Sequence, residues 1–186
     1  MKKSDSRLGK NQIYFISIFL ILALGVISFY FLINKKPKSN NLTEKSSPNK
    51  ISEPPFINEG TVEFTNGDSL IQSINVEIAD EDAKITQGMM YRTKMDENQG
   101  MIFIFPDEDL RNFWMKNTIL PLDIIFVDKN WNVVSIQKYA IPYNETGLPS
   151  EGPAMYVVEV SSGFSDRHNI KQGTKVKFTP SRKLLI

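Results

Sequence analysis

An apolar run near the N-terminus constrains this chain more than any other feature. The 21 residues from Ile13 to Ile33 include no charged side chain. As an α-helix they would span about 31 Å, which is enough to cross the hydrocarbon core of a bilayer. Tyr14 and Tyr30 lie near the two ends, where amphipathic rings favour the membrane interface. Such a helix would have no polar face, which argues against a buried helix of a soluble protein. We therefore expect a transmembrane helix at residues 13–33.

A cleaved signal peptide is the alternative for this segment. The apolar region of a signal peptide is usually about 7–15 residues long and precedes a small-x-small cleavage site. Here the run is longer and ends in Phe31-Leu32-Ile33, so an uncleaved signal anchor is favoured. Lys and Arg flank the run, with a slight excess before it, which favours a cytoplasmic N-terminus at residues 1–12. The remainder of a single-pass chain would then be extracytoplasmic.

The rest of the chain divides into a linker and a soluble domain. Residues 34–57 are rich in Lys, Pro, Ser and Asn, so we expect a flexible linker that buries too little surface to order itself. Residues 58–186 are predicted to fold as one soluble β domain, which we expect to be monomeric. They carry thirteen Lys or Arg and eighteen Asp or Glu, a balance of −5. An acidic domain is a poor binder of nucleic acid, because phosphate neutralisation needs clustered positive charge.

The pattern of the soluble part predicts a mainly β fold. Thr65-Asn66-Gly67-Asp68 separates two strand-like runs, and Asn-Gly is a strong hairpin signal. A second hairpin is predicted around residues 128–130, a short helix at residues 80–90, a helical turn near Ser162, and a long loop at residues 142–153. Strands are predicted at Val62–Phe64, Leu70–Ile78, Met101–Phe105, Leu122–Val127, Val133–Ile136, Met155–Val160 and Lys175–Phe178. Strands at this spacing favour a compact β-sandwich or barrel with one or two short helices.

Three motifs carry a resemblance to a known family. They are Gln87–Arg92, Gly100–Pro106 and Asn112–Asp128, in that order along the chain. Together they resemble the signature of the domain of unknown function 192 family, also called uncharacterised protein family 0127. The resemblance extends over roughly residues 60–180. It implies a mainly β domain with a small helix and a location in the bacterial inner membrane or cell envelope, and it implies no particular reaction.

The third motif contains the best candidate site. Its Lys and Asp could pair or bind a polar ligand, its Asn and Thr offer donors and acceptors, and its Trp could stack on a sugar or another planar group. Arg92 could hold a carboxylate bidentately. The candidate ligand-binding residues are Arg92, Trp114, Met115, Lys116, Asn117, Thr118 and Asp123. The structural interpretation is favoured for them: Met115 in the core, Asn117 and Thr118 bonding to the local backbone, Asp123 neutralising Lys116 or satisfying buried amides, and Arg92 pairing with an acid.

Two functional classes remain open. The first is a membrane-anchored binding module of the cell envelope that takes a small polar ligand or an envelope component. The second is an envelope hydrolase that uses Asp123 and a second carboxylate such as Glu159, which requires the two acids to converge in one cleft. No cofactor and no metal are expected, because the chain has no Cys and its Met residues lie beside no His. A triad built on His168, the single histidine, has little support from the sequence around it.

Overall fold

The computed structural model describes residues 53–185. The predicted anchor at residues 13–33 and most of the predicted linker lie outside these residues. Within residues 53–185, no helix is long and apolar enough to cross a membrane.

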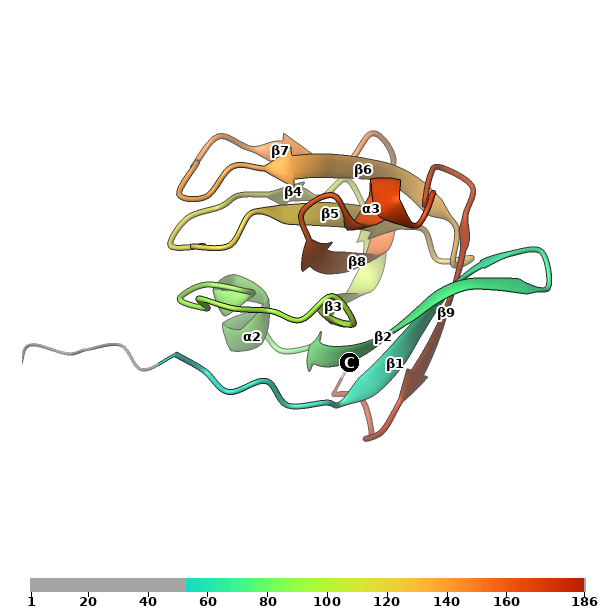
Figure 1. The fold of residues 1–186 in the computed structure, drawn as a ribbon, viewed down its shortest axis with the longest axis horizontal. Coiled ribbons are helices and arrows are strands. Elements are labelled where there is room, and N and C mark those ends of the chain that lie inside the picture. Colours follow the sequence, from blue (N-terminus) through green and yellow to red (C-terminus); the bar gives the residue numbers. More distant parts are fainter. Residues whose placement is uncertain (1–52, 186) are drawn as a thin grey trace, which may run out of the picture. The chain divides into compact units, whose positions relative to one another are not determined.

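The described residues form a mainly β domain with two short helices (Figure 1). In chain order the elements are β1 (Gly60–Asn66), β2 (Ser69–Ala79), α2 (Asp82–Gln87), β3 (Gln99–Asp109), β4 (Asn112–Phe113), β5 (Leu122–Val127), β6 (Val133–Ala140), β7 (Leu148–Pro149), β8 (Ala154–Ser161), α3 (Phe164–Arg167) and β9 (Lys175–Pro180). One seven-stranded sheet has the order β6-β5-β8-β3-β2-β1-β9, and β4 pairs with β7 separately. The mainly β prediction and both predicted hairpins are confirmed.

Local turn chemistry explains the two hairpins. β1 and β2 pair in antiparallel fashion out to Asn66 and Ser69, and Gly67 between them has a φ of 57°. Glycine adopts this left-handed conformation without a steric penalty. In the turn between β5 and β6, the Asp128 carboxylate accepts hydrogen bonds from the backbone N–H groups of Asn130 and Asn132, at 2.9 and 2.8 Å. These bonds stabilise a tight connection between the two strands.

One pair of neighbouring strands in the sheet is parallel. β2 and β3 run side by side in the same direction, and α2 lies in the connection between them. A parallel pair requires such a crossover, because a tight turn can join only antiparallel strands. The helix is shorter than the predicted residues 80–90, since it ends at Gln87, just before Gly88, where φ is 47°.

The sheet curls until its two ends approach each other. Asn132, in the β5–β6 turn, forms an isolated bridge with Lys175 at the start of β9. Two further backbone bonds reinforce it, from Val133 N–H to Thr174 O at 2.9 Å and from Val176 N–H to Trp131 O at 2.8 Å. The sheet is therefore a curled half-barrel rather than a two-sheet sandwich.

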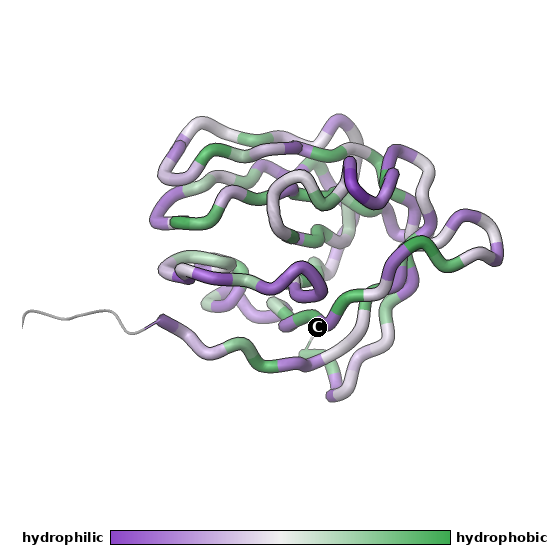
Figure 2. The backbone as a smooth tube through the Cα atoms, in the orientation of Figure 1, coloured by the Kyte–Doolittle hydropathy of each residue, from purple (hydrophilic) through white to green (hydrophobic). Residues whose placement is uncertain are grey.

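Hydrophobic side chains fill both faces of the central strands. Along β5 every residue is buried, and neighbouring side chains alternate between two core clusters. Ile125 and Val127 join the cluster inside the curl, whereas Ile124 and Phe126 join the cluster on the outer face. Figure 2 shows hydrophobic stretches along the strands of the sheet. Phe103, Ile124 and Phe126 are buried in the outer cluster, and Phe105 is partly buried against it.

The β4–β7 pair covers the outer cluster. Asn112 pairs with Pro149 and Phe113 with Leu148, so the segment predicted as a loop at residues 142–153 contains a short strand. Two-residue strands carry no periodicity that a sequence pattern could detect, which is why neither was predicted. Phe113 packs edge-to-face on Phe126 with ring centroids 5.8 Å apart.

Candidate functional site

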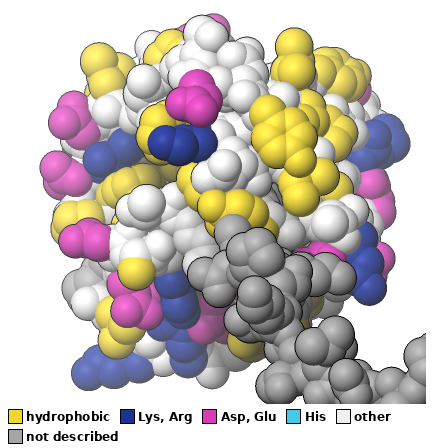
Figure 3. All heavy atoms as spheres, turned by 90° about the vertical axis from the view of Figure 1, so that its left-hand side faces the viewer, with side chains coloured by type: hydrophobic (Ala, Val, Ile, Leu, Met, Phe, Trp, Pro, Cys, Tyr) yellow, Lys and Arg dark blue, Asp and Glu magenta, His cyan; other side chains and the backbone are white. Residues whose placement is uncertain are grey.

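A pocket of about 370 Å³ opens on the outer face of the sheet. Its walls are the end of α2 and the turn after it (residues 85–90), Phe103 and Phe105 of β3, residues 110–114 around β4, Thr118, and Glu159 of β8. A cavity of this size is within the range of small-molecule sites. Figure 3 looks onto the side of the molecule where α2 and the loops after β4 and β6 lie, and hydrophobic side chains form patches there between charged ones.

Glu159 is the acidic residue of this pocket. It is 4% exposed, and its Oε2 atom has no hydrogen-bond partner in the described part of the chain. Burial raises the pKa of Glu159 from 4.5 to about 8, against the opposing effects of a hydrogen bond from the Met89 backbone and the charge of Arg92. The pocket therefore contains a carboxyl group that is largely neutral at pH 7 and has a free oxygen.

Gly88 allows the end of α2 to lie directly against Glu159. A Cβ atom at this position would be 3.2 Å from the Phe103 ring and 3.4 Å from Oε2 of Glu159. Both the positive φ and the close approach favour glycine here. The backbone turn of residues 87–90 is thus held over the carboxyl group.

Aromatic rings form the apolar wall of the pocket. Phe113 packs edge-to-face against Phe103 and Phe105, with centroid distances of 5.0 and 6.5 Å. Trp114 is 45% exposed, and Nζ of Lys116 lies over its ring, 4.9 Å from the centroid. The interlocked phenylalanines make a rigid wall, and Trp114 provides an accessible ring face beside it.

Arg111 also lines the pocket. Its guanidinium lies 4.0 Å from the centroid of the Phe105 ring. It donates hydrogen bonds to the backbone O of Ala154 at 3.0 Å and to Oδ1 of Asp107 at 2.8 Å. Those contacts fix its position and balance its charge.

The predicted residues of the third motif separate into wall and scaffold. Trp114 and Thr118 line the pocket, whereas Met115 is fully buried in the outer core cluster. Asn117 has a φ of 53°, and its backbone O accepts a hydrogen bond from Tyr91 N–H at 3.0 Å. The Thr118 hydroxyl donates to the backbone O of Lys116 at 3.2 Å. These bonds shape the loop after β4 and connect it to the turn after α2.

Asp123 lies outside the pocket and binds backbone amides. Its carboxylate accepts hydrogen bonds from the N–H groups of Tyr139 and Gly163, each at 3.0 Å, and of Ser165 at 2.9 Å. It is fully buried. Among residues 53–185, Lys116 makes no ion pair with Asp123. Asp123 therefore joins β5 to β6 and to the start of α3.

The two carboxyl groups of the hydrolase hypothesis face opposite sides of the sheet. In the β5–β8 register, Asp123 is opposite Val160 and Ile124 is opposite Glu159. Directly opposed residues share a face, and successive residues of a strand alternate. Val160 belongs to the inner cluster and Ile124 to the outer one. Asp123 and Glu159 consequently do not converge in one cleft, which that hypothesis requires.

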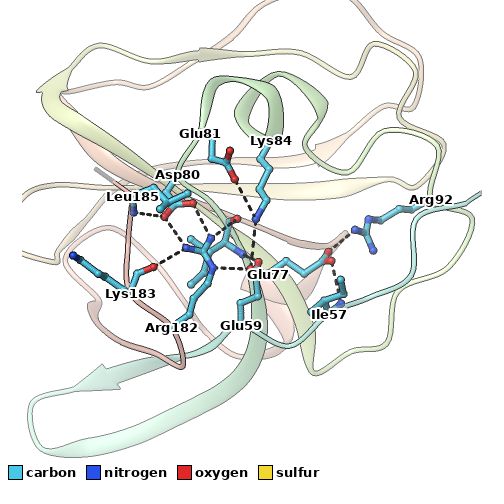
Figure 4. A network of polar contacts seen from close by, with 11 residues as sticks. Ile57, Glu59, Glu77, Asp80, Glu81, Lys84, Arg92, Arg182, Lys183 and Leu185 are labelled. Atoms are coloured by element: carbon cyan, nitrogen blue, oxygen red, sulfur yellow. Dashed lines mark hydrogen bonds and ion pairs between the residues drawn. The ribbon is translucent and has the colours of Figure 1, made fainter.

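Arg92 is buried beside a different cleft. Its Nη2 atom lies 2.5 Å from Oε2 of Glu77, and both side chains are under a tenth exposed (Figure 4). The cleft is lined by Pro54, Pro55 and Ile57, and the Ile57 N–H donates to Oε1 of Glu77 at 3.1 Å. The last residues of the predicted linker therefore contact the domain at this point.

His168 is not among the residues that line the pocket. Its Nε2 atom is 3.2 Å from Oε1 of Glu97, and its ring packs 4.5 Å from the Phe164 ring. No Ser-His-Asp arrangement is assembled around it in the described residues. Over the same residues, no cluster of three or more His, Asp or Glu side chains could hold a metal ion.

Sequence reasoning missed most of the pocket. The sequence pattern suggests Glu159 only as a second carboxylate for a hydrolase that uses Asp123. It links neither Arg111 nor the turn at residues 87–90 to a site. One signal was present, because Glu159 is a lone charged residue within the apolar strand Ala154–Ser161. Burying an ionisable side chain in such a strand destabilises the fold unless it is paired. A residue of this kind therefore marks a candidate functional site.

Comparisons with known proteins agree with this fold. The family described as uncharacterised ACR, domain of unknown function 192, matches residues 62–178. The crystal structure of a protein of unknown function from Novosphingobium aromaticivorans is similar at 36% identity and a TM-score of 0.61, covering 70% of this chain and 91% of its own. A candidate transcription regulator from Sinorhizobium meliloti is similar at 30% identity and a TM-score of 0.63, covering 68% and 98%. No curated protein matches the chain significantly.

Proposed function

Since the chain belongs to the uncharacterised domain of unknown function 192 family, we propose its function from the pocket: a membrane-anchored binding module for a small ligand of the cell envelope. The observation that carries the proposal is the buried Oε2 atom of Glu159, which has no partner within residues 53–185 and lines an aromatic pocket. A buried polar atom without a partner costs about 1–3 kcal/mol. A ligand that offers it a hydrogen bond would recover that cost.

The pocket walls support a ligand with a planar or apolar body. Phe103, Phe105 and Phe113 are fixed by their mutual edge-to-face contacts, and the exposed ring of Trp114 borders them. Aromatic surfaces of this kind bind planar groups by stacking and by excluding water. The polar contact to Glu159 would orient the ligand within the apolar wall.

The proposed location rests on the N-terminal sequence. The uncharged run at residues 13–33 would anchor the chain, and the polar residues after it would carry the domain on the outer side of the membrane. The description of the Sinorhizobium meliloti protein as a candidate transcription regulator is not carried over. The domain's charge balance of −5 does not favour binding to nucleic acid.

A ligand search on the full-length chain in mild detergent tests the proposal. Unfolding followed by tryptophan fluorescence detects a ligand, because one that binds the native state raises the midpoint by mass action. We expect an envelope-derived small molecule to raise it for the native chain and to lose that effect for Glu159→Gln. The control is Glu151→Gln, an exposed residue outside the pocket. A ligand that stabilises the native chain and Glu159→Gln equally would contradict the assignment of this pocket.

A further inference from the structure

The ligand's charge can be inferred from the groups that the pocket leaves without partners. Glu159 is the one acidic residue that lines it, and Oε2 is its buried atom without a hydrogen bond in the described chain. When Glu159 is ionised, this free carboxylate oxygen requires a hydrogen-bond donor. The Thr118 hydroxyl already donates to the Lys116 backbone O, so this nearby donor is engaged elsewhere.

Two aromatic rings at the pocket, Phe105 and Trp114, each have a cationic side chain of the protein over one face. The Arg111 guanidinium lies 4.0 Å from the Phe105 centroid, and the Lys116 ammonium lies 4.9 Å from the Trp114 centroid. Both distances are within the range of favourable cation–π contacts. Aromatic faces of this wall thus already accept positive charge, and Glu159 adds to that attraction when it is ionised.

We propose that the ligand carries a cationic nitrogen, an ammonium or amidinium group, that donates to Oε2 of Glu159 while its body packs on the aromatic wall. The inference rests on the proposed binding function and specifies its ligand class. Proton balance is simple: the neutral carboxylic acid releases its proton to solvent as the cation binds, and the carboxylate and cation form a charge-assisted hydrogen bond.

The surrounding charges are compatible with this pairing. Arg92, which follows α2, acts on Glu159 electrostatically, and its own charge is matched by Glu77. Arg111 lines the same pocket and is held by Asp107. Lys116 lies over the Trp114 ring and makes no ion pair with Glu159 in the described chain. With Arg92 and Arg111 paired to other acids, a buried Glu159 carboxylate would lack a direct ion-pair partner until a cationic ligand arrives.

Benzamidine and benzamide form a matched pair of probes. They share a planar shape, but benzamidine is a cation and benzamide is neutral. On the full-length chain in mild detergent, calorimetry at pH 6 and pH 8 measures both affinities. We expect benzamidine to bind more tightly than benzamide. Its affinity should increase about tenfold for each unit by which the pH rises towards 8, because one proton is released on binding. A neutral ligand that accepts a hydrogen bond from the protonated Glu159 would instead bind with nearly the same affinity at pH 6 and pH 8.

Two variants locate the interaction. Glu159→Gln keeps the shape of the side chain and should lose benzamidine binding and its pH dependence while keeping any benzamide binding. Trp114→Ala removes an exposed ring and should weaken benzamidine binding about tenfold. The control is Tyr143→Ala, an exposed aromatic outside the pocket, which should leave binding unchanged.

The outcomes separate this inference from the proposed function. Benzamide binding tighter than benzamidine, or equal benzamidine binding by Glu159→Gln, overturns the cationic ligand and leaves a binding pocket for a neutral one. Failure of benzamidine to bind at millimolar concentration also overturns the cationic ligand. Whether the protein is a binding module is then tested independently by the unbiased ligand search, which compares the native chain with Glu159→Gln.

Discussion

At the scale of single residues, Glu159 and Asp123 show how similar side chains acquire different roles. Both are buried acids on neighbouring central strands. Asp123 accepts three backbone hydrogen bonds, whereas one oxygen of Glu159 has no partner among the described residues. A fully satisfied buried acid stabilises the structure around it, and an unsatisfied one marks a place where something else can bind.

The first prediction concerns the pH dependence of stability. Because the pKa of Glu159 is raised from 4.5 to about 8, the folded chain holds its proton where the unfolded chain has lost it. This group therefore lowers the free energy of unfolding as pH rises from about 4.5 to 8, by up to about 1.4 kcal/mol per pH unit. Glu159→Gln should remove that slope and be the more stable protein at pH 8.5. Urea unfolding at several pH values checks this, and curves parallel to the native protein's would contradict it.

Asp123→Asn is the second prediction. An amide has one acceptor oxygen, and its NH₂ group would face a backbone N–H that now donates to the carboxylate. We expect a loss of about 1–3 kcal/mol in the free energy of unfolding. Asp68→Asn, in the exposed β1–β2 turn, is the control and should be nearly neutral. A normally stable Asp123→Asn protein that has lost ligand binding would instead make Asp123 part of the site.

At the scale of elements, the segment after β9 is fixed to the start of the α2 crossover. The Arg182 guanidinium contacts both oxygens of Asp80 at 2.7 and 2.9 Å and Oε1 of Glu59 at 2.7 Å (Figure 4). Leu185 N–H adds a bond to Asp80 at 2.8 Å. The Arg182 side chain lowers the pKa of Asp80 by hydrogen bonding to its carboxylate. The C-terminal segment thus holds the β1–β2 hairpin and the approach to α2 together.

Arg182→Ala is the third prediction. It removes the partner of the Asp80 side chain, which is fully buried, and leaves a charge uncompensated. We expect a loss of about 3 kcal/mol in the free energy of unfolding. Lys177→Ala, which breaks the solvent-exposed pair with Glu63, should cost under about 1 kcal/mol. Equal losses in the two variants, measured by urea unfolding, would show that the Arg182 network adds no more than a surface pair.

At the scale of the whole molecule, the proposed anchor at residues 13–33 would decide where the domain acts. The fourth prediction is that the chain stays full length in the membrane with residues 34–186 outside the cytoplasm. The long apolar run without a small-x-small site motivates it. Protease added to spheroplasts should remove a C-terminal epitope and leave a cytoplasmic marker intact. A protected epitope, or a released form that begins near residue 34, would contradict it.

The sequence alone determined the elements that depend on local chemistry. Asn66-Gly67 and Asp128 specify tight turns through the backbone conformations and side-chain bonds available to them, so both hairpins were predictable. Continuous apolar runs identified the buried strands, and the three motifs identified the family. Such features need only neighbouring residues.

Only the tertiary structure decided which side chains meet. Glu159, Gly88 and Trp114 come from distant parts of the chain and converge because the half-barrel brings β8, α2 and β4 to one face. The β5–β8 register turns Asp123 to the opposite face, which strand alternation alone could not reveal. Long-range pairing fixes the register, and a shift of one residue would exchange the faces of every side chain in a strand.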